Sequence, residues 1–164
     1  MDAVLDRLTN FFDWLGALAD RPSHRALGFL LGFPTAAVIG TAVWLTPSEK
    51  GFGTHTQLGL SGCAMLTFTG WPCPMCGMTT TFSLMAHLRP IDAFFNQPFG
   101  VILFTLTLLT ALVGTVDLLT GRGLLRASMR WIGRREQILA FGLLIGMIGG
   151  WVYKCIRMHP DLLG

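Results

Sequence analysis

Three of the four cysteines lie near the middle of the chain, at Cys63, Cys73 and Cys76. The last two belong to a Cys73-Pro74-Met75-Cys76-Gly77 turn. In such a turn, backbone N–H groups point at the first sulfur, and the glycine tolerates the tight geometry beside the second. Two chemistries fit a turn of this kind: a metal knuckle and a thiol–disulfide redox pair.

A zinc site is the first interpretation of these cysteines. The turn supplies two of the four ligands that a closed zinc site needs, so two more must come from elsewhere in the chain or from a second chain. Cys63 and a histidine, His87 or His55, would complete a Cys3His set. We therefore expect a candidate metal site at Cys63, Cys73, Cys76 and His87, with zinc as the candidate cofactor.

Redox chemistry is the second interpretation. A helix that starts near Gly77 would lower a thiol pKa in the Cys73–Cys76 pair, and Cys63 would exchange disulfides with that pair. In a third interpretation, the thiols pack as small hydrophobic groups and the turn is purely structural. A covalent c-type haem is excluded, because Gly77 stands where the Cys-x-x-Cys-His motif needs histidine.

No residue is predicted to be catalytic outside the redox alternative. The sequence has no GxSxG, HExxH, Walker A or GxGxxG motif in its proper context, and its apolar segments carry no paired carboxylates. The sequence therefore favours a protein that is not an enzyme.

Composition points to a membrane. Hydrophobic residues make up 52% of the 164 residues and charged residues only 13%. This charge is about half of that in soluble domains, which excludes disordered, collagenous and soluble nucleic-acid-binding proteins. Residues 26–45, 98–119 and 138–153 are apolar runs long enough, or nearly so, to cross a hydrocarbon core of about 30 Å as helices. We predict a single membrane domain over 1–164, all-α, with three transmembrane helices.

The cysteine-bearing segment, 57–88, is expected to be a helical hairpin. Each arm has about 15 apolar residues, or roughly 22 Å as helix, which is too short for an ordinary span. Pro72 and Pro74 between the arms forbid a continuous helix. The hairpin is either re-entrant or interfacial. Two further amphipathic interfacial helices are expected at 1–20 and at 122–135.

The basic residues predict the topology. Five of the twelve lie between the second and third apolar runs, which places that loop and the N-terminus in the cytoplasm and the cysteine motif on the extracytoplasmic side. Asp117, near the end of the second run, is expected to form an ion pair with one of the arginines that follow. Contacts with lipid headgroups are expected from Arg122, Arg126, Arg130 and Arg134.

Small residues recur every four positions in two of the predicted spans. Such stripes let helix backbones approach closely, either within the chain or in an assembly. They consist of Gly28, Gly32, Ala36 and Gly40 in the first span and Gly142, Gly146 and Gly150 in the third.

The segment from Cys63 to Pro98 resembles a family of small bacterial membrane proteins of unknown function. The family pattern is Cys-x5-Thr-Gly-x-Pro-Cys-Pro-x-Cys-Gly-x-Thr-Arg, followed by Asn-Pro before a span. Thr80 replaces the arginine of that pattern, and Gln97 is inserted within Asn-Pro. The matching positions are Cys63, Thr69, Gly70, Pro72, Cys73, Pro74, Cys76, Gly77, Thr79, Asn96 and Pro98. The resemblance implies a membrane protein with a few helices and supplies no activity.

Together these features predict a non-catalytic integral membrane subunit of a larger or homo-oligomeric assembly. Its partners would be the lipid bilayer and either other copies or other membrane proteins, with no nucleic acid. The alternatives are an extracytoplasmic thiol–disulfide protein using Cys73 and Cys76, and a zinc-stabilised membrane subunit.

Overall fold

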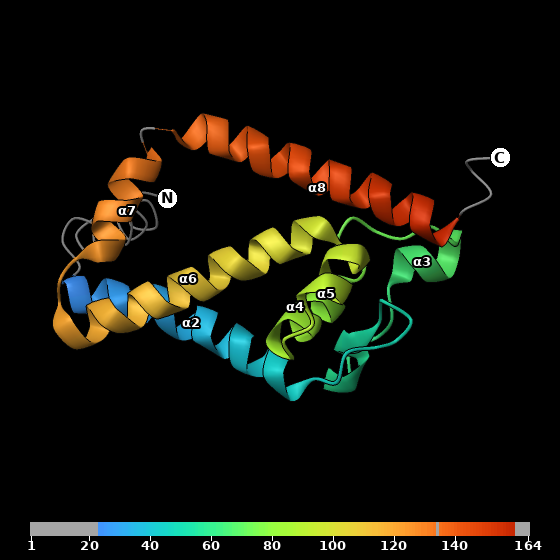
Figure 1. Cartoon of the computed structure of the whole chain (residues 1–164), viewed down its shortest axis with the longest axis horizontal. Helices are drawn as coiled ribbons and strands as arrows, with labels where there is room; N and C mark the ends of the chain where they lie inside the picture. The colour runs from blue at the N-terminus through green and yellow to red at the C-terminus, as the bar shows by residue number, and fades with distance from the viewer. Residues whose placement is uncertain (1–22, 134, 160–164) are drawn as a thin grey trace, which may run out of the picture.

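The structure, a computed structural model, describes residues 23–133 and 135–159. Within these ranges the chain is all helical, with seven α-helices, one 3-10 helix and no strand (Figure 1). The helix expected at 1–20 lies outside the described residues. The elements are α2 (His24–Trp44), η1 (Thr54–Leu58), α3 (Ala64–Thr69), α4 (Met78–Ala86), α5 (Pro90–Asn96), α6 (Pro98–Thr120), α7 (Leu124–Gly133) and α8 (Glu136–Met158).

Three helices, α2, α6 and α8, are long and apolar enough to cross a membrane, as predicted. They contain 21, 23 and 23 residues, with mean hydropathies of 1.8, 2.2 and 1.7. Helix α8 extends beyond the span predicted at 138–153, because it begins at Glu136 and continues through Lys154 to Met158. A helical backbone does not stop where a hydrophobic run does, so the polar last turns remain helical.

Helices α2 and α6 pack antiparallel at very short range. A Cβ atom built on Gly28 would lie 2.6 Å from the carbonyl oxygen of Gly114, and one built on Gly32 would lie 3.0 Å from the Gly114 Cα atom. Half of the predicted stripe on α2 therefore does mediate close packing. Its partner is a glycine of α6 that the sequence pattern had not singled out. Ala36 and Gly40, further along α2, are exposed.

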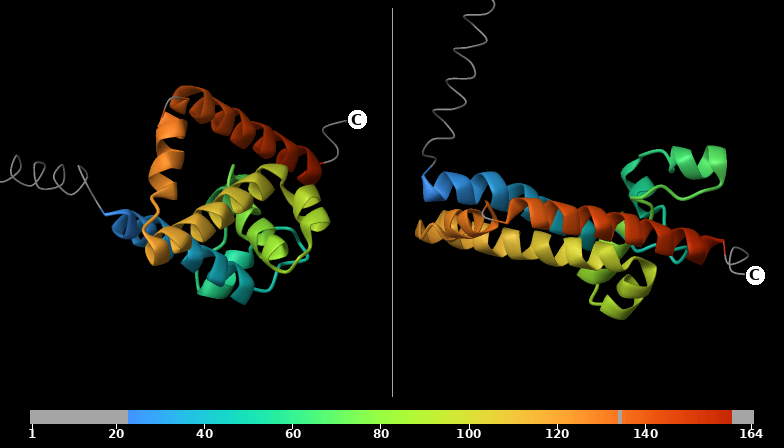
Figure 2. Two further views of the ribbon diagram at one scale, coloured as in Figure 1. Left: turned by 60° about the vertical axis from the view of Figure 1, so that its left-hand side comes forward. Right: turned by 90° about the horizontal axis from the view of Figure 1, so that it is seen from above.

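Helix α8 joins the bundle at one end only. Figure 2 shows α6, α7 and α8 as three sides of a triangle, with α8 meeting the start of α6. There, Gly146 and Gly150 face the side chain of Phe99, which would lie 2.9 Å from a Cβ atom on either glycine. Gly142 has no neighbour within 4 Å of such a Cβ atom. Two glycines of the predicted α8 stripe thus leave space for the side chain of Phe99 in α6.

The two ends of the molecule differ. Helix α7 lies with the start of α2 at one end, and α3, α4 and α5 lie at the other (Figure 1). Asp117 of α6 is fully buried, and its two carboxylate oxygens accept hydrogen bonds from the backbone N–H groups of Leu124 and Leu125, at 2.9 and 2.8 Å. The carboxylate therefore caps the first turn of α7, in place of the ion pair expected for it. The amphipathic helix expected at 122–135 does form, and its interfacial position stays a prediction.

The segment 57–88 contains two short helices on either side of an irregular turn. Helix α3 has six residues and α4 has nine, shorter than the arms that the apolar pattern indicated. Helix α4 packs against α2, α5 and α6, whereas α3 projects at the edge of the bundle beside the end of α8 (Figures 1 and 2). Whether the segment enters a bilayer or rests on its surface stays a prediction.

Candidate functional site

The three central cysteines form one cluster. The Sγ atoms of Cys63, Cys73 and Cys76 all lie within 4.8 Å of one another. All are free thiols; Cys76 is buried and the other two are partly buried. This cluster, the cysteine centre below, lies outside the three helices that could span a membrane.

Local backbone geometry places each of these thiols. Cys63 is the N-cap residue of α3. Cys73 and Cys76 lie at the ends of a tight turn, closed by a 2.9 Å hydrogen bond from the Cys76 N–H to the Cys73 carbonyl. Pro74 occupies the second position of this turn, where its fixed φ is favourable. The spacing of two cysteines around such a turn brings both thiols close together.

Gly77 makes the sharp exit from this turn possible. Its φ is +89°, in the left-handed region that favours glycine. A Cβ atom here would also lie 2.7 Å from the Gly51 carbonyl oxygen and 3.0 Å from the Lys154 Nζ atom. Both the backbone angle and the crowded surroundings therefore exclude larger residues.

The three thiols differ in their electrostatic surroundings. The backbone N–H of Leu66, in the first turn of α3, lowers the pKa of Cys63. Burial raises the pKa of Cys73. Burial, together with the charges of the other two thiolates, raises the pKa of Cys76 to about 11. Cys63 is therefore the thiol that ionises most readily, and a bound cation would offset the cost of ionising all three.

A partly buried network of hydrogen bonds supports the cysteine turn at Gly77. Lys154 Nζ, on α8, donates to the Gly51 carbonyl oxygen at 3.0 Å and to Asn96 Oδ1 at 2.7 Å. Asn96 Nδ2 in turn donates to the Gly77 carbonyl oxygen at 3.2 Å and to Thr81 Oγ1 at 2.9 Å. The network joins α8, α5 and α4 at the residue that follows Cys76.

Thr80 and Gln97, the two positions at which the sequence departs from the pattern that it resembles, are both buried. Thr80 is fully buried, and its hydroxyl lies 2.8 Å from that of Thr54 in η1. Gln97 is also fully buried, and its Nε2 donates to the Pro74 carbonyl oxygen at 3.3 Å. Gln97, the N-cap residue of α6, thus supports the cysteine turn through this hydrogen bond. The threonine ties α4 to η1, in a space that leaves no room for an arginine.

Residues at the end of α8 contact the segment that precedes Cys73. Trp151 Nε1 donates to the Pro72 carbonyl oxygen at 2.8 Å. The ring of His159 contacts that of Trp71 in a tilted arrangement, with centroids 4.7 Å apart, and its Nε2 lies 3.1 Å from the Gly70 carbonyl oxygen. These contacts hold residues 70–72 against the end of α8, and no residue of α4 takes part in them.

The predicted histidine ligand lies elsewhere. His87 is the C-cap residue of α4, at the far end of that helix from Cys76, and its Nδ1 bonds to the Ser83 carbonyl oxygen at 2.8 Å. His55 is in η1, with its Nε2 3.2 Å from the Ser61 carbonyl oxygen. The group of close potential ligands thus comprises the three cysteines, and the described residues show no histidine among them.

The arginines predicted to contact lipid lie at the opposite end of the bundle from the cysteines. Arg122, Arg126 and Arg130 are on or just before α7, and Arg134 is outside the described residues. Their headgroup contacts stay a prediction.

Sequence reasoning did not predict the supporting roles of Lys154, Gly51 and Asn96, although Asn96 is one of the positions that match the pattern the sequence resembles. One signal was available for Lys154: a lone lysine inside a long apolar helix needs an internal partner or an interface. No local pattern indicated that Asn96 and Gly51 would meet it.

Comparison with known protein families finds a match over part of the chain. A family model described as "Protein of unknown function (DUF2752)" matches residues 63–111. No curated protein and no solved structure matches the chain. The matched segment contains the cysteine centre and Asn96 but not Lys154. Over the segment that begins at Cys63 and ends within α6, the chain is therefore similar to a family whose function is unknown.

Proposed function

We propose that the chain is a non-catalytic, multi-pass membrane subunit whose cysteine centre binds a zinc ion. The observation that carries this proposal is the mutual approach of three free thiols to within 4.8 Å. Two of them come from one turn and the third from the start of a separate helix.

The spacing of the sulfurs suits a thiophilic metal. With Zn–S bonds of about 2.3 Å, two sulfurs on a tetrahedral ion lie about 3.8 Å apart. Small rotations of the cysteine side chains close the difference from the observed spacing. The three thiolates would hold the ion, and the ion would supply folding free energy.

A structural role is supported by where the thiols lie. Helix α3 projects at the edge of the bundle, whereas the Cys73–Cys76 turn is fixed by Gly77, Gln97 and α8. A metal shared by Cys63 and the turn would fasten the start of α3 to the rest of the molecule. The fourth coordination position would be filled by water or by a ligand from another chain.

Assembly through α8 completes the proposal. This helix contacts the bundle near Phe99, and apolar side chains are exposed along the rest of its length, including Ile138, Phe141 and Ile145. We place the protein in a bacterial inner membrane with the cysteine centre on the extracytoplasmic side. The position of α7 and the cysteine centre at opposite ends supports this topology.

Metal analysis tests the zinc centre. The full chain is purified without chelator or affinity metal, and zinc content and free thiols are measured on the same sample. We expect about one zinc per chain, or one per two chains, and loss of that zinc in Cys76→Ser. Cys155→Ser is the matched control, because Cys155 is a free thiol outside the cluster.

Two results would overturn the zinc centre. A reducible disulfide without metal would replace it with the thiol–disulfide alternative. Three free thiols without metal would leave the turn a packing element. The subunit role is tested separately by native mass in mild detergent, where a stable lone monomer would contradict it.

A further inference from the structure

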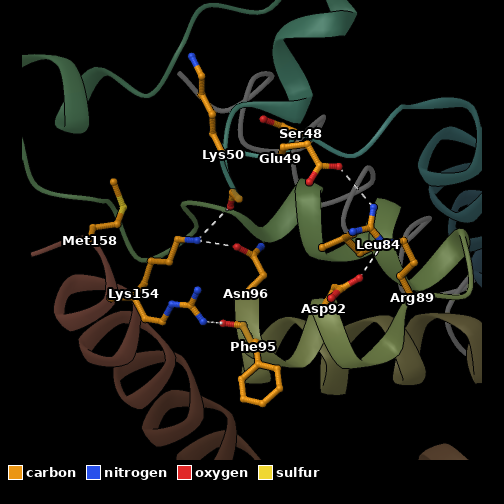
Figure 3. A pocket seen from close by; sticks show the side chains of 12 residues that line it. Ser48, Glu49, Lys50, Leu84, Arg89, Asp92, Phe95, Asn96, Lys154 and Met158 are labelled. Carbon is orange, nitrogen blue, oxygen red and sulfur yellow. Dashed lines mark hydrogen bonds and ion pairs between the residues drawn. The ribbon is translucent and has the colours of Figure 1, made fainter. Parts of the chain in front are cut away.

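A second polar site lies beside the cysteine centre, on the far side of Lys154. It is a cavity of about 300 Å³ between residues 48–51, α4, α5 and the last turns of α8. Figure 3 shows Arg89, Asp92, Asn96 and Lys154 around it, with the Lys50 side chain pointing away. The family match ends before α8, so this cavity is partly built from residues that the match does not cover.

The charges in this cavity are unbalanced. Arg89 Nε lies 2.7 Å from Asp92 Oδ2, and its Nη1 lies 3.5 Å from Glu49 Oε1, so one arginine serves both carboxylates. Lys154 and Arg157 also line the cavity. Across residues 23–133 and 135–159, neither of them forms an ion pair with a carboxylate.

Burial makes the charge of Lys154 costly. Lys154 is only 5% exposed, and its hydrogen bonds to Gly51 and Asn96 are to neutral oxygens, which leaves one of its three N–H donors free. Arg157 donates to the Phe95 carbonyl oxygen through Nη1 alone, which leaves the rest of its guanidinium for a ligand. A bound anion would offset the desolvation of Lys154 and would accept hydrogen bonds from the exposed Arg157 guanidinium.

The surroundings indicate the kind of anion. Lys154 and Arg157 stand in the last turns of a helix long enough and apolar enough to span a bilayer. A bilayer crossed by α8 would place its phosphates near the ends of that helix. Phe95 lines the cavity and also a neighbouring apolar hollow of about 440 Å³, formed with Pro90, Ile91, Phe94 and Val101. A phosphate site that continues into an exposed apolar surface fits a lipid better than a free ion.

We propose that this cavity binds the phosphate group of an anionic phospholipid, with Arg157 and Lys154 as its ligands and α5 as the surface for an acyl chain. Lys154 is shared with the network that supports the cysteine turn, whereas Arg157 is not. Loss of the Arg157 charge should therefore leave the metal content unchanged.

A lipid titration of the full chain tests the proposal. Native mass spectrometry in mild detergent measures binding of short-chain phosphatidylglycerol, phosphatidylcholine and inorganic phosphate. We expect phosphatidylglycerol to bind at least tenfold more tightly than phosphatidylcholine, because the choline cation cancels the phosphate charge. Equal binding of the two lipids would overturn the proposal, and saturable binding of inorganic phosphate with equal affinity would overturn its lipid part.

Charge variants locate the site. Arg157→Gln should weaken phosphatidylglycerol binding about tenfold, the low end for a lost charge-assisted contact. Arg157→Lys should retain part of the affinity, and Glu49→Gln should bind at least as tightly as the natural chain. Arg135→Gln, at the other end of α8, is the matched control and should change affinity less than twofold. An equal loss in Arg135→Gln and Arg157→Gln would show unspecific attraction and overturn the site.

Discussion

The crossing of α2 and α6 makes a quantitative prediction for Gly114→Ala. A Cβ atom at this position would lie 2.5 Å from the Gly32 Cα atom, 2.9 Å from the Gly32 nitrogen and 3.1 Å from the Gly28 carbonyl oxygen. All three atoms belong to backbone, so no side chain can rotate away. Carbon atoms pack optimally at about 3.5–4.0 Å, so the two helices must separate by roughly 1 Å.

The cost follows from this separation. Overpacking of a close interface typically destabilises a protein by about 1–3 kcal/mol. Alanine recovers up to about 1 kcal/mol through its better helix propensity. We therefore expect Gly114→Ala to lower the free energy of unfolding by up to about 2 kcal/mol.

Gly40→Ala is the matched control, since a Cβ atom there has nothing within 4 Å. It should be neutral or slightly stabilising. Tryptophan fluorescence during thermal unfolding in mild detergent measures both variants, with a shift of about 2–4 °C expected per kcal/mol. If Gly114→Ala and Gly40→Ala unfold at the same temperature, the close α2–α6 crossing is refuted.

Two further variants test other positions. Asp117→Ala removes the acceptor for the backbone N–H groups of Leu124 and Leu125, and it should lower the free energy of unfolding by about 1–3 kcal/mol. Hydrogen exchange should become faster at these two amides, and unchanged protection would contradict the cap. Gly77→Ala combines a positive φ with a crowded Cβ position, whereas Gly59→Ala has a positive φ of +77° and free space. Thermal unfolding should therefore show a larger loss for Gly77→Ala, and equal losses would mean that crowding at the turn is unimportant.

The three long helices were predictable because the information for them is local. A run of apolar residues long enough to cross a bilayer favours helix whatever its neighbours are, since every backbone group is then bonded within the segment. Helix α8 is longer than the predicted span, because Lys154 and Arg157 end the apolar run near its C-terminal end but continue the helix. The hydrophobicity of a helix indicates which part of it contacts lipid. The backbone hydrogen bonds of the helix determine where the helix ends.

The cysteine centre was predictable in part. The Cys73–Cys76 pair follows from turn geometry, which four consecutive residues determine. The choice of His87 as a fourth ligand relied on nearness in sequence, and α4 carries this residue away from the turn. A rigid helix separates residues that a flexible loop would leave close.

By itself, the sequence determined the all-helical class, the three apolar helices, the paired thiols of the turn and the two stripes of small residues. Each of these depends on residues within a few turns of one another. Only the tertiary structure decided that Gly28 and Gly32 meet Gly114, that Asp117 caps α7, and that Lys154 reaches Asn96 beside the cysteine turn. The glycine and lysine contacts join segments far apart in the chain and depend on how whole helices cross. The Asp117 cap depends on how the chain turns between α6 and α7, and no pattern of residues specified it.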